Sequence, residues 1–155
     1  MVRRELVEQP EMIYVLYGQP GSGKTTLGKL LANHLNTPFI IDGDEFREMF
    51  TNKNYGKEGR EENIRNANAV ATYLNKKSHT EGHVVISLVN PYEHLRDELK
   101  VNNVRQVTEI MLCSNRELRK EYHVEDFEGG IPNHIMNTDR DVGDSWGELK
   151  ELLKI

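Results

Sequence analysis

The sequence predicts an α/β protein in which a five-stranded parallel sheet lies between two layers of helices. Five short apolar runs are separated by segments whose apolar residues recur every three or four positions, as they do on one face of a helix. A strand followed by a helix and a second strand forms a parallel pair joined by a right-handed crossover. The chain of 155 residues is long enough for one core, so a single domain spanning 1–155 is expected.

The first half of the chain alternates strand and helix. The run 12–17 is apolar and stops at Gly18, which predicts a buried strand that enters a turn. A helix at 24–34 follows, because its leucines recur at three- and four-residue spacing. A second strand is expected at 39–41, before a short helix that carries Phe46.

The second half repeats this alternation. Residues 58–77 keep helical spacing over about five turns and lead to an apolar run at 84–89. Pro91 can occupy the first turn of the next helix, ahead of a strand at 107–112. The remaining elements are expected to be a helix at 115–122, a strand at 134–137 and a helix at 144–153 capped by Asp144 or Ser145.

Composition argues against several classes of protein. The formal net charge of −5 disfavours binding to duplex nucleic acid, which requires clustered Lys and Arg. No apolar run approaches the length of a membrane span, so neither a membrane partner nor a compartment other than the cytoplasm is expected. The single cysteine, Cys113, ends an apolar run and is interpreted as a buried strand residue.

A glycine-rich turn between the first strand and the first helix carries the strongest motif. Its pattern is Gly-x-x-x-x-Gly-Lys-Ser/Thr, and the residues are Gly18, Gln19, Pro20, Gly21, Ser22, Gly23, Lys24 and Thr25, followed by Thr26. Backbone N–H groups in such a turn converge on phosphate oxygens at the positive end of the helix. The sequence therefore predicts a P-loop that binds ATP, within a P-loop NTPase fold.

Two residues of this motif have specific chemical roles. Lys24 is expected to reach the β- and γ-phosphates, as a catalytic positive charge. The Thr25 hydroxyl is expected to bind Mg²⁺ that bridges the same phosphates. An ordinary glycine-rich turn has no need of Lys followed by Thr, so ATP and Mg²⁺ are the predicted cofactors.

Carboxylates follow the second strand, at the edge of a parallel sheet where ligands gather. Asp42 and Asp44 are candidates, and Asp44 is preferred as the residue that binds Mg²⁺ or accepts a proton from a substrate hydroxyl. The alternative is a polar turn that caps a helix. Arg47, Arg60 and Arg65 could bind an anionic substrate, although each alone is typical of a solvated helix residue.

From about Tyr14 to Lys100 the chain resembles the adenylylsulfate kinases. The resemblance rests on the Asp-Gly-Asp sequence at 42–44 with Arg47, on Arg-Glu-Glu-Asn-Ile-Arg at 60–65, and on Pro-Tyr at 91–92 with Arg-Asp at 96–97. It implies transfer of the γ-phosphate of ATP to the 3′-hydroxyl of adenylylsulfate, and it also implies that a homodimer could form. The implied substrate-binding residues are Asp42, Asp44, Arg47, Arg60, Asn63 and Ser87, together with positions 88 and 90.

The chain departs from the family pattern at those last two positions and in the lid. Leu88 stands where the family usually has a phenylalanine that stacks on adenine, and Asn90 stands where it has serine. The lid is shorter and more acidic than in the family, and Arg116 and Arg119 are its remaining candidates for contact with ATP. Two alternatives therefore stay open: a kinase for another hydroxyl compound, such as a modified nucleotide or sugar, and a nucleotide-binding module without turnover.

Overall fold

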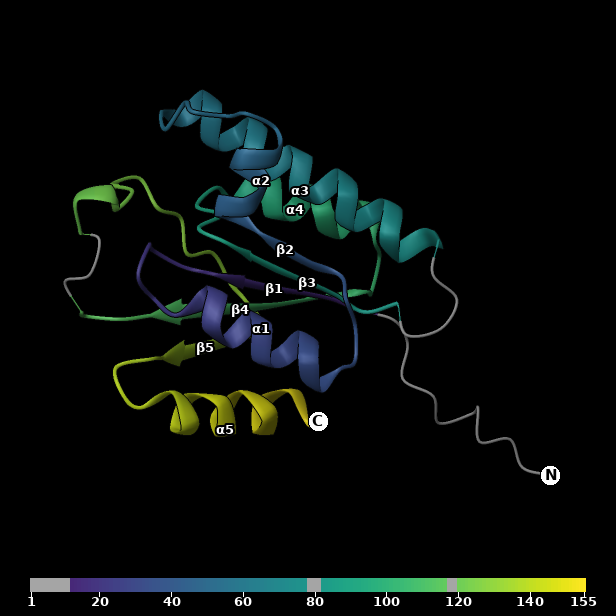
Figure 1. Cartoon of the computed structure of the whole chain (residues 1–155), viewed down its shortest axis with the longest axis vertical. Helices are drawn as coiled ribbons and strands as arrows, with labels where there is room; N and C mark the ends of the chain where they lie inside the picture. Colours follow the sequence, from purple (N-terminus) through teal and green to yellow (C-terminus); the bar gives the residue numbers. More distant parts are fainter. Residues whose placement is uncertain (1–11, 78–81, 117–119) are drawn as a thin grey trace.

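Five strands form one parallel sheet in the computed structural model, which describes residues 12–77, 82–116 and 120–155. The strands are β1 (Ile13–Tyr17), β2 (Ile40–Asp42), β3 (Val84–Leu88), β4 (Val107–Cys113) and β5 (His134–Asn137), in the order β2-β3-β1-β4-β5 (Figure 1). The helices are α1 (Lys24–His34), α2 (Gly43–Met49), α3 (Lys57–Lys77), α4 (Glu93–Asn102) and α5 (Val142–Leu153). The predicted three-layer P-loop fold is therefore confirmed.

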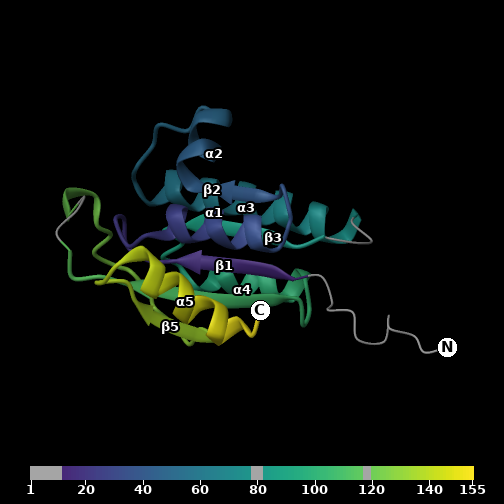
Figure 2. The same cartoon turned by 60° about the horizontal axis from the view of Figure 1, so that its bottom comes forward.

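The central strand decides where a ligand can bind. β1 lies between β3 and β4, with Ile13 in register with Val84 on one side and Val107 on the other. β2 and β5 form the two edges of the sheet (Figure 2). The connection that leaves β1 leads to one side of the sheet and the connection that leaves β3 leads to the other, which opens a crevice at the carboxyl ends of these two neighbouring strands.

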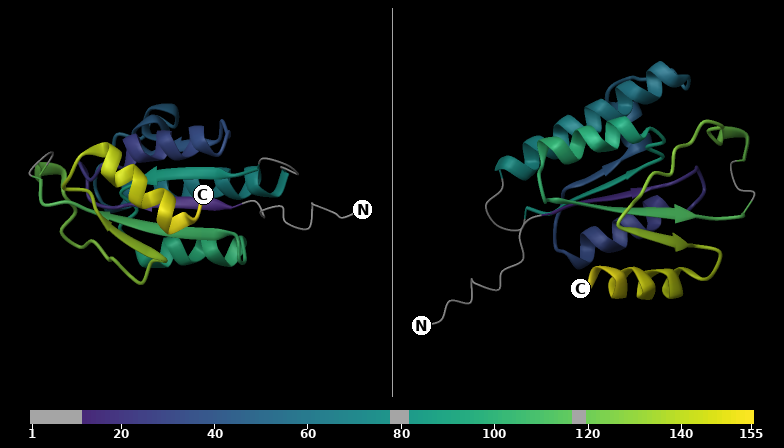
Figure 3. Two further views of the ribbon diagram at one scale, coloured as in Figure 1. Left: turned by 90° about the horizontal axis from the view of Figure 1, so that it is seen from below. Right: turned by 180° about the vertical axis from the view of Figure 1, so that it is seen from behind.

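Alternate residues of each strand enter separate cores on the two faces of the sheet. Val15 and Ile86 pack with α3 and α4, whereas Leu16 and Val85 pack with α1 and α5. Figure 3 shows α3 and α4 together on one face and α1 and α5 on the other. Because β1 and β3 are covered on both faces, every residue of these two strands is buried.

Two helix starts differ from the prediction. α5 begins at Val142 and is capped by Asp141, whose carboxylate accepts from the Gly143 N–H at 2.8 Å, so neither Asp144 nor Ser145 is the cap. Pro91 lies ahead of α4, whose N-cap is Tyr92, rather than in its first turn. A capping side chain marks the start of α5, whereas the Tyr92 side chain makes no cap hydrogen bond at α4, and apolar spacing determines neither start.

The helix expected at 115–122 is largely absent from the described residues there. A short 3₁₀ turn covers Lys120–Tyr122, residues 114–116 are irregular, and 117–119 lie outside the described part of the chain. Cys113 is the last residue of β4. It was expected to be buried, but it is partly exposed. Within the described ranges, no helix is long and apolar enough to cross a membrane.

Candidate functional site

The P-loop occupies the turn between β1 and α1. Gly21 and Gly23 adopt left-handed φ angles of 85° and 93°, which residues with a side chain rarely accept. Gly18 is required for a different reason, because a Cβ there would lie 2.3 Å from the Leu112 carbonyl oxygen. Gly23 is the N-cap of α1 and offers no side-chain cap, so the first N–H groups of that helix face the turn. The loop therefore has the form of an anion-binding cradle.

Lys24 lies folded against this cradle. Its Nζ donates to the Gln19 carbonyl oxygen at 2.9 Å and approaches Ser22 Oγ at 3.4 Å. These contacts hold the ammonium group at the mouth of the loop. A positive charge is thus placed where a bound phosphate chain would emerge.

Thr25 and Asp42 bring a hydroxyl and a carboxylate together. Thr25 Oγ1 donates to Asp42 Oδ1 at 2.8 Å, while Asp42 Oδ2 accepts from the backbone N–H groups of Asp44 and Glu45 at 3.2 and 3.4 Å. Asp42 is therefore both the N-cap of α2 and the partner of the P-loop threonine. Among the described residues no group of three or more His, Cys, Asp or Glu could hold a metal, so a cation here would need further oxygens from phosphate or water.

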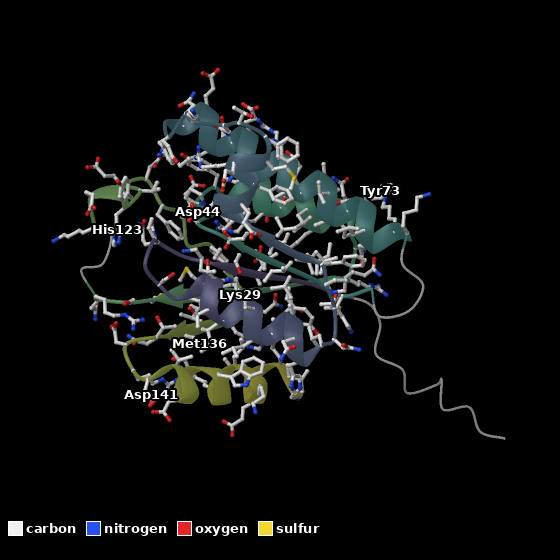
Figure 4. All side chains as sticks on the ribbon, in the orientation of Figure 1. Lys29, Asp44, Tyr73, His123, Met136 and Asp141 are labelled. Atoms are coloured by element: carbon white, nitrogen blue, oxygen red, sulfur yellow. The ribbon has the colours of Figure 1, made fainter. Side chains whose placement is uncertain are left out.

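A cavity of about 710 Å³ joins the P-loop to α2, to the start of α3 and to the end of β3. Most of the predicted site residues line it: Pro20, Gly21, Gly23, Lys24, Thr25, Thr26, Asp42, Asp44, Arg47, Arg60, Asn63, Ser87, Leu88 and Asn90. Asp44, the preferred catalytic carboxylate, lies at the base of α2, on the same side of the molecule as His123 (Figure 4). The fold thus brings together residues from four separate parts of the chain.

The remaining candidates lie elsewhere. Gly18, Gln19 and Ser22 belong to the P-loop but do not line the cavity, and Arg65 is exposed on α3. Arg116 Nη2 donates to the Thr138 carbonyl oxygen at 2.7 Å, and its Nε lies 3.6 Å from Asp139 Oδ1. Arg119 lies outside the described residues.

Two arginines line the part of the cavity that α2 and α3 form. Arg47 lies over the Tyr55 ring at 4.2 Å and donates to the Asn54 carbonyl oxygen at 2.8 Å. Arg60 Nε donates to the Tyr92 hydroxyl at 2.9 Å, and its Nη1 donates to the Tyr55 carbonyl oxygen at 2.8 Å. Burial lowers the pKa of Arg47, which nevertheless remains protonated at any physiological pH. This part of the cavity is positively charged.

The end of β3 supports the P-loop from the side. Ser87 Oγ donates to the Lys24 carbonyl oxygen at 3.0 Å. Gly28 of α1 permits this approach, because a Cβ on that residue would lie 2.2 Å from Ser87 Oγ. Leu88 is buried against Gly43 at the start of α2. Ser87 therefore connects β3 to α1, and Leu88 gives the cavity an apolar patch.

Sequence reasoning missed the residues that attach segment 120–129 to the P-loop. Gln19 Nε2 donates to the Val124 carbonyl oxygen and Gln19 Oε1 accepts from the Val124 N–H, each at 2.8 Å. His123 Nε2 lies 3.1 Å from the Pro20 carbonyl oxygen. The sequence carries no signal for these pairs, since they join residues about a hundred positions apart.

The far end of segment 120–129 is attached to β1 and α4. The Phe127 ring stacks on Tyr17 with centroids 6.2 Å apart, and the Tyr17 hydroxyl donates to the Gly129 carbonyl oxygen at 2.5 Å. Burial raises the pKa of Tyr17 to about 12, although Arg96 beside it acts in the opposite direction. Asp126 also reaches Arg60 at 4.0 Å. The segment therefore covers one side of the cavity and contacts its positively charged part.

The family model described as adenylylsulphate kinase matches residues 9–125 of the chain. Among curated proteins, a cytidylate kinase from Pyrobaculum arsenaticum is 28% identical over 120 residues, which are 72% of this chain and 65% of that protein. The chain thus spans a little less than two thirds of that relative.

Solved structures agree on the fold. The Mycobacterium tuberculosis APS kinase in complex with AMPPNP and APS aligns with a TM-score of 0.77 and 19% identity, over 96% of this chain and all of that one. A shikimate kinase from Bacteroides thetaiotaomicron aligns with a TM-score of 0.66 and 26% identity, over 93% and 99% of the two chains. Both similar structures are named as kinases, with different acceptors in their names.

Proposed function

This chain belongs to the adenylylsulfate kinase family, and from that premise we propose that it transfers the γ-phosphate of ATP to the 3′-hydroxyl of adenylylsulfate, giving 3′-phosphoadenylylsulfate and ADP. The observation that carries the proposal is the composition of one cavity. The P-loop with the Thr25–Asp42 pair forms one part of its lining, and Arg47, Arg60 and Asn63 form another. A phosphate donor and an anionic acceptor would meet within this one cavity.

The P-loop side would bind ATP. Backbone N–H groups at the start of α1 would accept the phosphates, with Lys24 adding its charge at the β- and γ-phosphates. Thr25 and Asp42 fit Mg²⁺, because a hydroxyl and a carboxylate oxygen already lie 2.8 Å apart. Bound Mg²⁺ would neutralise charge on the phosphates during transfer.

The part of the cavity that Arg47 and Arg60 line would hold the acceptor. The two arginines carry the positive charge that a sulfate-bearing nucleotide requires, and Asn63 offers an amide beside them. Asp44 lies in the first turn of α2, lines the same cavity, and is proposed to accept the proton of the attacking hydroxyl. Segment 120–129 would limit the access of water to the reacting groups. Catalysis would then rest on positioning and electrostatics.

The direct test is ADP release. The purified protein is incubated with ATP and Mg²⁺, with and without adenylylsulfate, and the nucleotide products are identified by mass spectrometry. The proposal requires ADP and 3′-phosphoadenylylsulfate in equal amounts. ADP release that does not depend on adenylylsulfate would contradict it.

A second candidate is the same chemistry on another hydroxyl compound. Leu88, which is buried and aliphatic, cannot stack on adenine as an aromatic ring does. Asp126 also places a negative charge 4.0 Å from Arg60, where an anionic substrate would bind. A panel of shikimate, gluconate and nucleoside monophosphates in the same assay separates the two acceptors. Binding of ATP without ADP release on any acceptor would instead support a nucleotide-binding module without turnover.

A further inference from the structure

Asp126 reaches from segment 120–129 to an arginine of the cavity. Its Oδ1 lies 4.0 Å from Arg60 Nη2, and the two side chains are 59% and 25% exposed. The other two nitrogens of Arg60 are engaged, because Nε donates to the Tyr92 hydroxyl and Nη1 to the Tyr55 carbonyl oxygen. Among the described residues Nη2 makes no hydrogen bond. The nitrogen that remains for an anionic ligand is therefore the one that Asp126 approaches.

The backbone on both sides of Asp126 is fixed. Residues 125–126 form a turn. Before this turn, Val124 is hydrogen-bonded to the P-loop through both its N–H and its carbonyl oxygen. After it, the Glu128 N–H donates to the Pro91 carbonyl oxygen at 2.8 Å. The carboxylate is thus placed beside the arginine before any ligand binds.

The contact changes the charge that an acceptor meets more than it changes the stability of the fold. Ion pairs between exposed side chains add little to stability, and at 4.0 Å this one is too long for a hydrogen bond. Arg47 and Arg60 line the part of the cavity that α2 and α3 form, together with Asp44, and Asp126 adds a second carboxylate. Two positive charges are thus balanced by two negative ones before an acceptor binds.

We infer that Asp126 determines acceptor specificity by charge: it weakens the binding of each acceptor in proportion to the negative charge that the acceptor brings to Arg60. The physical reason is that Coulomb repulsion grows with the product of the two charges. This inference rests on the proposed function, in which Arg60 binds the anionic end of adenylylsulfate. A terminal sulfate carries one negative charge, whereas a terminal phosphate carries nearly two near neutral pH. Asp126 therefore favours a nucleotide that ends in sulfate over one that ends in phosphate.

The test uses three nucleosides of similar size that form a charge series. Adenosine is neutral, adenosine 5′-sulfate carries one negative charge, and AMP carries close to two at pH 8, because its second pKa is about 6. Their dissociation constants are measured by calorimetry with the full-length wild-type protein and with Asp126→Asn. Mg²⁺ and saturating AMPPNP, an ATP analogue used here to prevent transfer, are added to fill the P-loop.

The expected result is a graded gain in affinity. In Asp126→Asn, adenosine should bind as it does to the wild-type protein, adenosine 5′-sulfate about threefold more tightly, and AMP about tenfold more tightly. Asparagine keeps the size of the side chain and the residue is exposed, so the midpoint of thermal unfolding should not change. A purely structural role of Asp126 would instead shift the three constants by the same factor.

The matched control is Glu125→Gln, which removes the same charge from the same turn. Glu125 is exposed and is not among the described contacts of Arg60. All three dissociation constants should therefore stay within about twofold of the wild-type values, because solvent and salt screen a more distant exposed charge. The inference is overturned if Asp126→Asn changes the three constants equally or not at all. The same graded gain in Glu125→Gln, or no binding of any of the three nucleosides, also overturns it.

The proposed function fails by a separate result, the absence of ADP release with adenylylsulfate. The charge series measures binding without transfer, so in that case a graded gain in Asp126→Asn still supports the role of Asp126. Conversely, ADP release with adenylylsulfate and no graded gain would keep the proposed function and overturn the inference.

Discussion

Thr25 Oγ1 donates a hydrogen bond to Asp42 Oδ1 across 2.8 Å, although the two residues are 17 positions apart in the chain. The contact joins the end of the P-loop to the end of β2. It makes Asp42 a hydrogen-bond partner of the P-loop hydroxyl, while Asp44 lies in the first turn of α2. The two aspartates therefore have separable roles.

Asp42→Asn should raise the Mg²⁺ concentration needed for half-maximal activity and lower kcat about 100-fold, because asparagine removes the negative charge beside Thr25. Asparagine is also a good helix cap, so α2 and the midpoint of thermal unfolding should change little. Asp44→Asn is the comparison: kcat falls by about 100-fold or more through loss of the proton acceptor, with no change in Mg²⁺ dependence. Identical Mg²⁺ profiles for both variants would refute this division.

Arg60→Ala should raise the KM for adenylylsulfate at least about tenfold, because the cavity would lose the contact of this guanidinium with an anionic acceptor. The KM for ATP should stay within about twofold, since ATP would bind at the P-loop. Arg65→Ala is the matched control, on the same helix but exposed and away from the cavity. Equal effects of Arg60→Ala on the two substrates would count against its assignment.

Gln19→Leu should loosen segment 120–129 without unfolding the protein. Leucine keeps the approximate size of the side chain but removes both hydrogen bonds to Val124. The backbone amides of 120–128 are then expected to exchange with deuterium about tenfold faster, as local opening becomes easier. Hydrogen-exchange mass spectrometry measures this, and the amides of β1 serve as the internal control. Unchanged exchange in the segment would mean that other contacts hold it.

Arg96→Leu should lower the free energy of unfolding by about 3 kcal/mol, because it leaves the buried carboxylate of Glu109 without one of its two cationic neighbours. The variant also removes the hydrogen bonds to the Asn90 and Glu128 carbonyl oxygens and the contact with the Tyr17 ring. Urea denaturation gives the value. Lys29→Leu, on the exposed face of α1, should change it by less than about 0.5 kcal/mol.

Cys113 should react slowly with iodoacetamide near neutral pH. Burial raises the pKa of its thiol, and the thiolate is the reactive form, so a smaller fraction is reactive at any given pH. The alkylation rate should still be climbing at pH 9, where an unfolded control in urea is already levelling off. The chain has no other cysteine, so mass spectrometry of the intact protein follows the reaction. A rate that levels off at the same pH in both states would contradict the shift.

Patterns of residues that are close together in the sequence predicted much of the fold. Short apolar runs located four of the strands and the break at Gly129, Gly130 and Pro132 preceded the fifth, while the spacing of the P-loop glycines, Lys24 and Thr25 located the phosphate cradle. These features depend on residues within a few positions of one another, whose backbone preferences act over the same short range. At 115–116 the expected helix is absent, and Asn115 and Arg116 instead bond to Asp139 and Thr138, more than twenty positions away.

The tertiary structure alone decided how the site is assembled. Which aspartate meets Thr25, which residue ties segment 120–129 to the P-loop, and which carboxylate approaches Arg60 all depend on contacts between elements far apart in sequence. Asp42 and Asp44 look alike in the sequence, and Asp126 looks like an ordinary loop carboxylate. Only the order of the strands and the close packing of their carboxyl ends give these residues different surroundings, and hydrogen bonds and ion pairs are decided by surroundings within about 4 Å.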